Sequence, residues 1–216
     1  MIEELSQTQS NNELASWTRI GIASGFLACV VYPIMTLVSM PRIPQVMIGA
    51  SFGPALAVAS IALAYILQSR RRTPSLVLAP IFNSLAGALV TAMIIVQLAI
   101  NYSTAPSADD QLASILKQRV WDVVLGLDVS FDVFIGLGTL CFSVNMLSDP
   151  RFGKIIGWAG IFVSIVPLFG ANIYYFPDPP YVHGFPHVGI FTGLWYLAVV
   201  FLIVRSVRKK FTLSQS

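Results

Sequence analysis

The stretch LVLAPIFNSLAGALVTAMIIVQLAI, residues 76–100, contains no charged residue. As an α-helix it would be roughly 37 Å long, which is enough to cross a hydrocarbon core of about 30 Å. Lipid leaves the open backbone groups of strands unsatisfied, and the chain lacks the alternating pattern of a membrane barrel. Six segments share this apolar character, and they cover residues 20–40, 45–68, 76–100, 120–147, 155–175 and 187–204. The sequence therefore predicts an all-α membrane protein, a bundle of six transmembrane helices.

The composition of the whole chain supports the same class. Of its 216 residues, 56% are hydrophobic and 11% are charged, with a mean hydropathy of +0.75. A soluble domain is about 25% charged, and a disordered chain combines high charge with low hydrophobicity. The net charge of +3 comes from bases in short loops, without the basic face of a nucleic-acid binder. Cys29 and Cys141 lie inside apolar segments and are expected to be free, buried thiols.

The segment before the first predicted span is polar, and the segment after the last one is basic. Residues 1–18 form a polar amino-terminal segment without the basic start of a signal peptide, so we expect the first span to be retained. Residues 19–205 form the transmembrane domain, and residues 206–216 form a basic tail. The longest connection, residues 101–119, continues at helical spacing through Leu112 and Ile115. Two interpretations remain open for it: a short amphipathic surface helix, or an extension of the fourth span.

Positive charges predict the orientation of the bundle. With the amino terminus in the cytoplasm, three bases lie outside, namely Arg42, Lys117 and Arg119. The other ten lie inside, and they are Arg19, Arg70, Arg71, Arg72, Arg151, Lys154, Arg205, Arg208, Lys209 and Lys210. Because bases favour the cytoplasmic side, we expect both termini in the cytoplasm, with the protein in the inner membrane of a bacterium-like cell.

Several glycines and prolines lie inside or at the ends of the predicted spans. Prolines inside predicted helices favour kinks, and they are Pro33, Pro54, Pro80 and Pro167. Glycine pairs with GxxxG spacing favour close helix packing, and they are Gly21/Gly25, Gly49/Gly53, Gly153/Gly157 and Gly189/Gly193. The same glycine faces also allow association into a homo-oligomer or a larger membrane complex.

The fourth span differs from the others because it carries acidic residues. Asp128 and Asp132 lie roughly 12 and 18 Å from Val120 along a helix, near the middle of the bilayer. A spacing of four residues places both on one helix face, whereas Asp122 lies nearer water. The same face continues through three small or polar residues: Gly136, Thr139 and Ser143. This acidic stripe must face protein or water rather than lipid.

No Lys or Arg lies inside a predicted span to neutralise these two acids. A carboxylate at this depth costs at least ~2.5 kcal/mol, so the acids are protonated, bind a cation or border a hydrated region. Neutral side chains that offer hydrogen bonds are Asn83, Gln97, Asn172, Tyr174 and Tyr175. We therefore expect Asp128 and Asp132, supported by Asn83 and Gln97, to bind a ligand, a proton or a cation. The alternative is a structural role in which protonated acids hydrogen-bond between helices.

A second polar cluster precedes the last span. His183 and His187 have a spacing that metal sites use, and Asp178 adds a third ligand, with Asp122 within reach from the fourth span. Solvated histidines in an aromatic belt are the alternative. The chain has no phosphate-binding glycine loop, GxSxG, CxxC or HExxH motif, so it specifies no catalytic residue and no cofactor.

Two segments resemble a known family. Asp149-Pro-Arg-Phe-Gly-Lys-Ile-Ile-Gly157 and Thr18-Arg-Ile-Gly21 resemble an uncharacterised family of six-helix bacterial membrane proteins, a domain of unknown function. This resemblance implies the six-helix architecture and no activity. The His183/His187 pair is also similar to the HxxxH pair of alkaline-ceramidase and adiponectin-receptor-like hydrolases, but the third zinc-binding histidine is missing here.

Three functions follow from these patterns. The first is a small transporter-like or ligand-binding protein that uses the acidic stripe. The second is a non-catalytic subunit or scaffold of a membrane complex, for which the glycine faces suffice. The third is a metal-dependent membrane hydrolase at the histidine pair.

The orientation gives a direct test. A cysteine introduced at Ser69 should resist an impermeant thiol reagent added to intact cells, because the bases at 70–72 place it in the cytoplasm. A cysteine at Ser107 should react with the same reagent. The opposite labelling pattern would reverse the predicted orientation.

Overall fold

The computed structural model describes residues 2–102, 110–178, 180–186 and 188–213, and these residues contain helices and no strand. The first four helices are α1 (Ile2–Leu37), α2 (Arg42–Gln68), α3 (Pro74–Tyr102) and α4 (Asp110–Met146). The fifth span combines α5 (Gly153–Val163), the π-helical segment η1 (Ser164–Ala171) and α6 (Asn172–Tyr175). A short 3-10 turn, η2 (Pro180–His183), then leads into α7 (Val188–Leu213).

Six helical stretches are long and apolar enough to cross a membrane. Their bounds are Asn12–Met35, Arg42–Gln68, Pro74–Tyr102, Leu112–Met146, Gly153–Tyr175 and Val188–Val207. The predicted all-α class and the number of spans are therefore confirmed. Residues 2–18 are already helical and continuous with the first span, and the last helix continues into the basic tail as far as Leu213.

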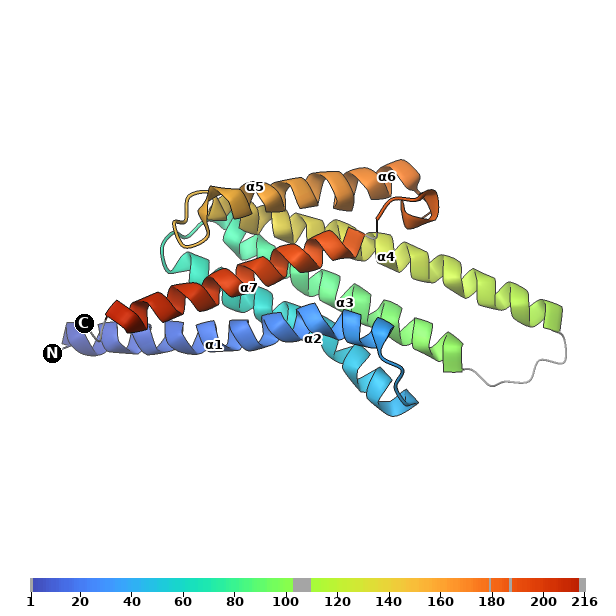
Figure 1. The fold of residues 1–216 in the computed structure, drawn as a ribbon, viewed down its shortest axis with the longest axis horizontal. Coiled ribbons are helices and arrows are strands. Elements are labelled where there is room, and N and C mark those ends of the chain that lie inside the picture. The colour runs from blue at the N-terminus through green and yellow to red at the C-terminus, as the bar shows by residue number, and fades with distance from the viewer. Residues whose placement is uncertain (1, 103–109, 179, 187, 214–216) are drawn as a thin grey trace.

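The helices pack in chain order, and α7 closes the bundle against α1 and α5. The start of α1 and the end of α7 lie at the same end of the bundle, together with the α2–α3 and α4–α5 turns (Figure 1). We call this the basic end, because it carries Arg70–Arg72 and Arg151. The opposite end carries the α1–α2 connection and the segment between α6 and α7 (Figure 1).

The connection before the fourth span resolves the choice that the sequence left open. The helix α4 begins at Asp110 and runs without interruption to Met146, so the structure agrees with an extension of the fourth span rather than with a surface helix that runs into it. Leu112, Ile115 and Leu116 stay exposed along this extension. Lengthening an existing helix avoids the cost of a new helix nucleus, which explains why the chain continues rather than turns.

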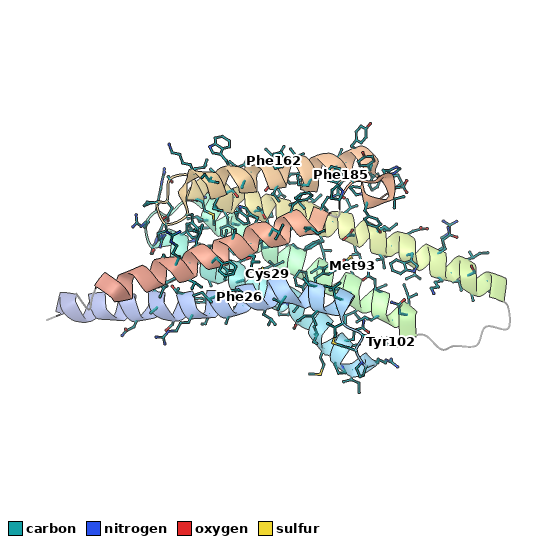
Figure 2. All side chains as sticks on the ribbon, in the orientation of Figure 1. Phe26, Cys29, Met93, Tyr102, Phe162 and Phe185 are labelled. Atoms are coloured by element: carbon teal, nitrogen blue, oxygen red, sulfur yellow. The ribbon has the colours of Figure 1, made fainter. Side chains whose placement is uncertain are left out.

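Apolar side chains cover the outside of the bundle as well as its interior. Trp158 and Phe162 on α5 are exposed, and Figure 2 shows Phe162 projecting from the bundle. Contiguous exposed apolar surface of this kind suits lipid rather than water. Cys29 and Cys141 are free thiols, as predicted, but both are half-buried rather than buried. The Cys29 Sγ lies 3.9 Å from the Gly193 carbonyl oxygen of α7.

Close helix packing explains most of the predicted glycine pairs. At Gly53 of α2, an added Cβ would lie 2.0 Å from the Gly87 carbonyl oxygen of α3, so the two backbones touch. Gly21, Gly25, Gly49 and Gly157 also pack against neighbouring helices of the same chain. Two glycines differ: Gly153 has a positive φ of 80° at the start of α5, and Gly193 faces open space. Association of chains through these glycines stays a prediction.

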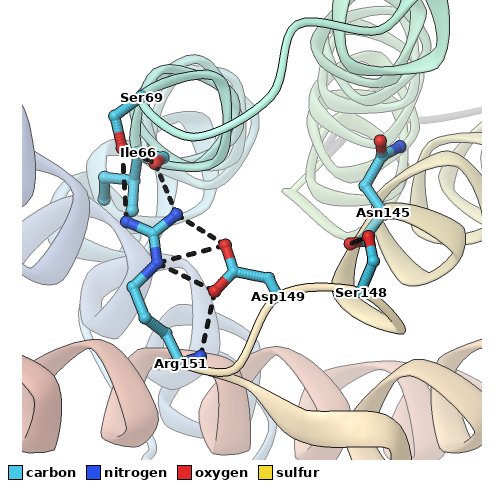
Figure 3. A network of polar contacts seen from close by, with 6 residues as sticks. All are labelled: Ile66, Ser69, Asn145, Ser148, Asp149 and Arg151. Atoms are coloured by element: carbon cyan, nitrogen blue, oxygen red, sulfur yellow. Dashed lines mark hydrogen bonds and ion pairs between the residues drawn. The ribbon is translucent and has the colours of Figure 1, made fainter.

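At the basic end, an ion pair between Arg151 and Asp149 connects the α4–α5 turn to α2 (Figure 3). The Arg151 guanidinium donates to the Asp149 carboxylate at 2.6 Å through Nη2 and at 3.0 Å through Nε. It also donates to the Ile66 carbonyl oxygen at 2.8 Å and to Ser69 Oγ at 3.3 Å. The α4–α5 turn therefore binds a carbonyl near the end of α2 that accepts a hydrogen bond from the Ser69 hydroxyl as well.

This ion pair also sets the ionisation of Asp149. Burial alone would raise the pKa of Asp149, but the hydrogen bonds and the charge of Arg151 outweigh burial and lower that pKa below its ordinary value. Because the folded-state pKa is the lower one, the pair adds stability above the ordinary pKa of about 3.9. That stability is lost as the pH falls through the folded-state pKa.

Replacing Arg151 therefore has a predictable effect. Arg151→Ala leaves the buried Asp149 carboxylate without its partner and should lower the free energy of unfolding by roughly 3 kcal/mol at neutral pH. The difference from the wild type should shrink once the pH falls below about 4 and Asp149 becomes protonated. Thermal unfolding in detergent measures both effects, with the exposed Arg71→Ala as the control. Equal stabilities of Arg151→Ala and the wild type at neutral pH would contradict this account.

Candidate functional site

The acidic stripe of α4 faces the interior of the bundle. Asp128 is half-buried and Asp132 is only 2% exposed. Further along the same face, Gly136, Thr139 and Ser143 are buried as well. This placement agrees with the expectation that such a stripe avoids lipid.

Asn172 of α6 is the hydrogen-bond partner of Asp132. Its Nδ2 donates to Asp132 Oδ2 at 2.8 Å and also to the Leu168 carbonyl oxygen at 2.9 Å. A carbonyl oxygen only accepts hydrogen bonds, so the bond to Leu168 fixes which side of the amide faces Asp132. The acid therefore meets a fixed N–H donor from a helix 40 residues further along the chain.

The break in the fifth span explains how Asn172 reaches Asp132. Pro167 lacks an N–H, and its ring would clash with a carbonyl in a regular α-helix. The wider turns of η1 accommodate this proline and rotate the residues that follow it. As a result Asn172 is buried, whereas the next two residues, Ile173 and Tyr174, are exposed. Of the two predicted tyrosine partners of the acids, Tyr174 therefore points away from them.

Two tyrosines lie near the acids at the opposite end of the bundle. The Tyr32 ring of α1 lies within electrostatic range of Asp128, Asp132 and Tyr181. Burial, and then the nearby Asp128 carboxylate, raise the pKa of Tyr181 above its ordinary value, so its phenol stays protonated at neutral pH. Tyr32 and Tyr181 are 40% and 47% exposed, so the acids have two partly exposed tyrosines as neighbours.

Asn83, a predicted partner of the acids, bonds elsewhere. Its Nδ2 donates to Ser60 Oγ at 2.8 Å and to Tyr196 Oη at 2.6 Å. Thr139 of the acidic stripe donates to the same Tyr196 oxygen at 3.2 Å. Asn83 therefore lies at the level of Thr139, two helical turns beyond Asp132. We call these hydrogen-bonded side chains the hydroxyl network: Ser60, Asn83, Thr139 and Tyr196. Gln97 is half-buried 14 residues further along α3, and its role at the acids stays a prediction.

The predicted metal ligands come together only in part. His183 Nε2 lies 3.4 Å from Asp178 Oδ2, and its ring stacks on Tyr175 with centroids 4.8 Å apart. His187 lies outside the described residues, so the three-ligand site stays a prediction. Asp122 instead pairs with Arg119 at 3.3 Å. Among the described residues, no three His, Cys, Asp or Glu side chains gather as a metal site requires.

The two ends of the bundle differ in access to the stripe. At the basic end, buried side chains from four helices close the interior, and they include Leu67, Leu76, Phe142, Met146 and Trp195. At the opposite end, Asp128 is half-buried and its tyrosine neighbours are partly exposed. The acids are therefore more accessible from the opposite end than from the basic end.

Sequence reasoning missed two parts of this arrangement. Pro167 indicated a kink, but the sequence did not show that a π-helical segment would turn Asn172 inward. Tyr196 was hidden in an apolar span, where an aromatic residue is usually part of the core. Its hydroxyl nevertheless accepts two hydrogen bonds at the centre of the bundle.

Comparison of the chain with protein-family models, curated proteins and solved structures finds no match. The resemblance to a six-helix bacterial family therefore stays a prediction. The class of the protein rests on its own fold: it is a polytopic helical membrane protein with six apolar spans.

The bond between Asp132 and Asn172 gives a prediction for this site. In a double-mutant cycle with Asp132→Leu and Asn172→Leu, the stability losses should be non-additive by about 0.5–3 kcal/mol, because each residue satisfies the other. Unfolding in detergent measures the coupling. The matched control pairs Asn172→Leu with Asp122→Leu, whose effects should add, since Asp122 is exposed and bonds Arg119. Additive losses in the first cycle would contradict the bond.

Proposed function

We propose that the protein is a small transporter-like membrane protein that binds a proton or a small cation at Asp128 and Asp132. One observation carries the proposal: Asp132 is 2% exposed within a membrane span, where the neutral Asn172 amide donates a hydrogen bond to its carboxyl group. Acids inside membrane spans are rare and costly, and they are functional sites by default.

The electrostatics of the pair favour an added positive charge. Asp128 and Asp132 are one helical turn apart on α4, so two ionised carboxylates would repel each other. Asn172 supplies one neutral donor to Asp132, which offsets only part of the cost of removing a carboxylate from water. Binding a proton or a cation removes both the repulsion and most of that cost.

The broken fifth span supports a transporter-like role. Transporters bind their substrates and coupling ions near the middle of the bilayer, beside helices that are interrupted there. Here the π-helical segment lies directly against the stripe, because an added Cβ at Gly136 would touch Leu168 and Phe169 at 3.3 Å. π-Helical segments inside α-helices occur frequently at functional sites.

The charge distribution indicates the side from which the ion enters. The bases at the basic end favour the cytoplasm, so the opposite end faces the outside of the cell. Asp128 and its two tyrosines lie toward that end, whereas the cluster that includes Phe142 and Met146 closes the other. In this conformation the acids therefore receive an ion from outside.

A thermal-shift experiment tests the proposal. We expect the melting temperature of the wild type to respond to pH, or to added inorganic cations or small amines, between about pH 4 and pH 9. Asp128→Asn and Asp132→Asn keep the side-chain volume, so each should fold and show a smaller response. The double variant should show none. Asp122→Asn is the matched control on the same helix and should behave as the wild type does.

Two results would contradict the proposal. A response that survives unchanged in the double variant would place the binding site elsewhere. A wild type that responds to neither pH nor any cation would instead favour the scaffold function, in which the acids hold helices together through protonated hydrogen bonds.

A further inference from the structure

Two turns at the basic end are joined by hydrogen bonds and form one surface. Arg151 of the α4–α5 turn donates to the Ile66 carbonyl oxygen at 2.8 Å and to Ser69 Oγ at 3.3 Å, where α2 ends (Figure 3). Thr73, which directly precedes α3, donates to Asn145 Oδ1 of α4 at 2.7 Å. The α2–α3 turn and the α4–α5 turn are therefore fixed side by side at the same end of the bundle (Figure 1).

This surface carries more positive charge than its acid can neutralise. Four exposed bases lie on it, and we call them the basic patch: Arg70, Arg71, Arg72 and Lys154. Asp149 is the one acid of the two turns, and Arg151 already binds its carboxylate at 2.6 Å. Arg70 lies within electrostatic range of Asp149, so the bases of the two turns lie close together. The ion pairs found among the described residues include no base of the patch.

Exposed apolar side chains begin directly beside the basic patch. On α5, Ile155 follows Lys154 and is 83% exposed, and Trp158 is exposed one helical turn further along. On α3, Val77 and Leu78 are exposed within about one turn of the start of the helix. The helix α4 packs against both α3 and α5, so this apolar surface continues across neighbouring helices. A ligand that matches the whole surface combines an anionic group with apolar chains.

We propose that this surface binds an anionic phospholipid, whose phosphate contacts the basic patch and whose acyl chains lie against α3 and α5. The inference goes beyond the proposed function, because it involves neither Asp128 nor Asp132.

The chemistry of the patch fits a phosphate. A guanidinium donates two parallel hydrogen bonds to phosphate oxygens, and three consecutive arginines offer several such arrangements. The Lys154 ammonium reaches the headgroup region from the first turn of an otherwise apolar helix, and the Trp158 indole suits the same interface. Bases beside a membrane surface each add roughly five-fold to the affinity for anionic lipids.

The apolar neighbours favour a lipid over a soluble anion. A soluble anion would meet only exposed bases, whose attraction is screened by salt. The acyl chains of a lipid bury apolar surface against Ile155 and Val77 and hold the phosphate at the level of the patch. A zwitterionic phospholipid has the same chains, but its own ammonium group offsets the charge of its phosphate.

Thermal unfolding of the full-length protein in detergent tests the inference. Phosphatidylglycerol and phosphatidylcholine with identical acyl chains are the two probes, each added over a range of concentrations. Because a ligand of the folded state stabilises it, phosphatidylglycerol should raise the melting temperature of the wild type. Its half-maximal effect should come at a several-fold lower concentration than that of phosphatidylcholine.

Substitutions in the patch should weaken this response. Arg70→Gln/Arg71→Gln/Arg72→Gln should raise the phosphatidylglycerol concentration for the half-maximal shift by roughly two orders of magnitude. Lys154→Gln alone should raise it roughly five-fold, because the α4–α5 turn contributes one base. Both variants change exposed side chains, so each should fold and unfold cooperatively without lipid.

The matched control removes the same number of bases from the opposite end of the bundle. Arg42→Gln/Lys117→Gln/Arg119→Gln lowers the net charge as much as the triple patch variant does. Its response to phosphatidylglycerol should equal that of the wild type. Glycerol 3-phosphate, which has the phosphate but no acyl chains, should not change the melting temperature of the wild type.

Four results would overturn the inference. Equal responses to phosphatidylglycerol and phosphatidylcholine would remove the role of headgroup charge. An equal loss in the control variant would reduce the effect to net charge. A full shift with glycerol 3-phosphate would assign the patch to a soluble anion. A wild-type response in Lys154→Gln would exclude a site shared by the two turns.

Discussion

The buried carboxyl group of Asp132 is the constraint on which the rest of the interior depends. A charged group at this depth costs several kcal/mol, so the bundle must supply a partner or accept a proton. The fifth span supplies that partner through a π-helical segment at Pro167, which turns Asn172 toward the acid. Gly136 permits the close approach of this segment to α4. An irregular helix and a small residue thus position the two partners of one hydrogen bond.

The asymmetry between the two ends gives this site a direction. Arg151 and Asp149 bind the α4–α5 turn to the end of α2, and a cluster that includes Phe142 and Met146 fills the interior behind them. Toward the opposite end, polar side chains succeed one another from Tyr181 and Tyr32 to Asp128 and Asp132. Release of an ion toward the basic end would require that cluster to part. The ion pair at Arg151 holds the α4–α5 turn against α2 at that end.

Much of this architecture could be predicted from the sequence. In lipid, an uncharged segment such as residues 76–100 is stable only as an α-helix, because a helix satisfies its own backbone hydrogen bonds. The number and type of the spans therefore follow from composition. The inward direction of the acidic stripe could be predicted from helical periodicity and from the free-energy cost of exposing a carboxylate to lipid. Its partners did not, because Asn83 and Asn172 are equally polar in the sequence and only tertiary packing decides which one reaches Asp132. The π-helical segment also depends on neighbours rather than on local pattern.

The central claim is that Asp132 exchanges a positive ion rather than serving only as a structural hydrogen-bonding group. Potentiometric titration of purified protein measures this most directly, by comparing the protons taken up by the wild type and by Asp132→Asn between about pH 4 and pH 9. The account predicts that the wild type takes up one more proton per molecule, in a step that the variant lacks. Coincident titration curves for the two proteins would contradict the account.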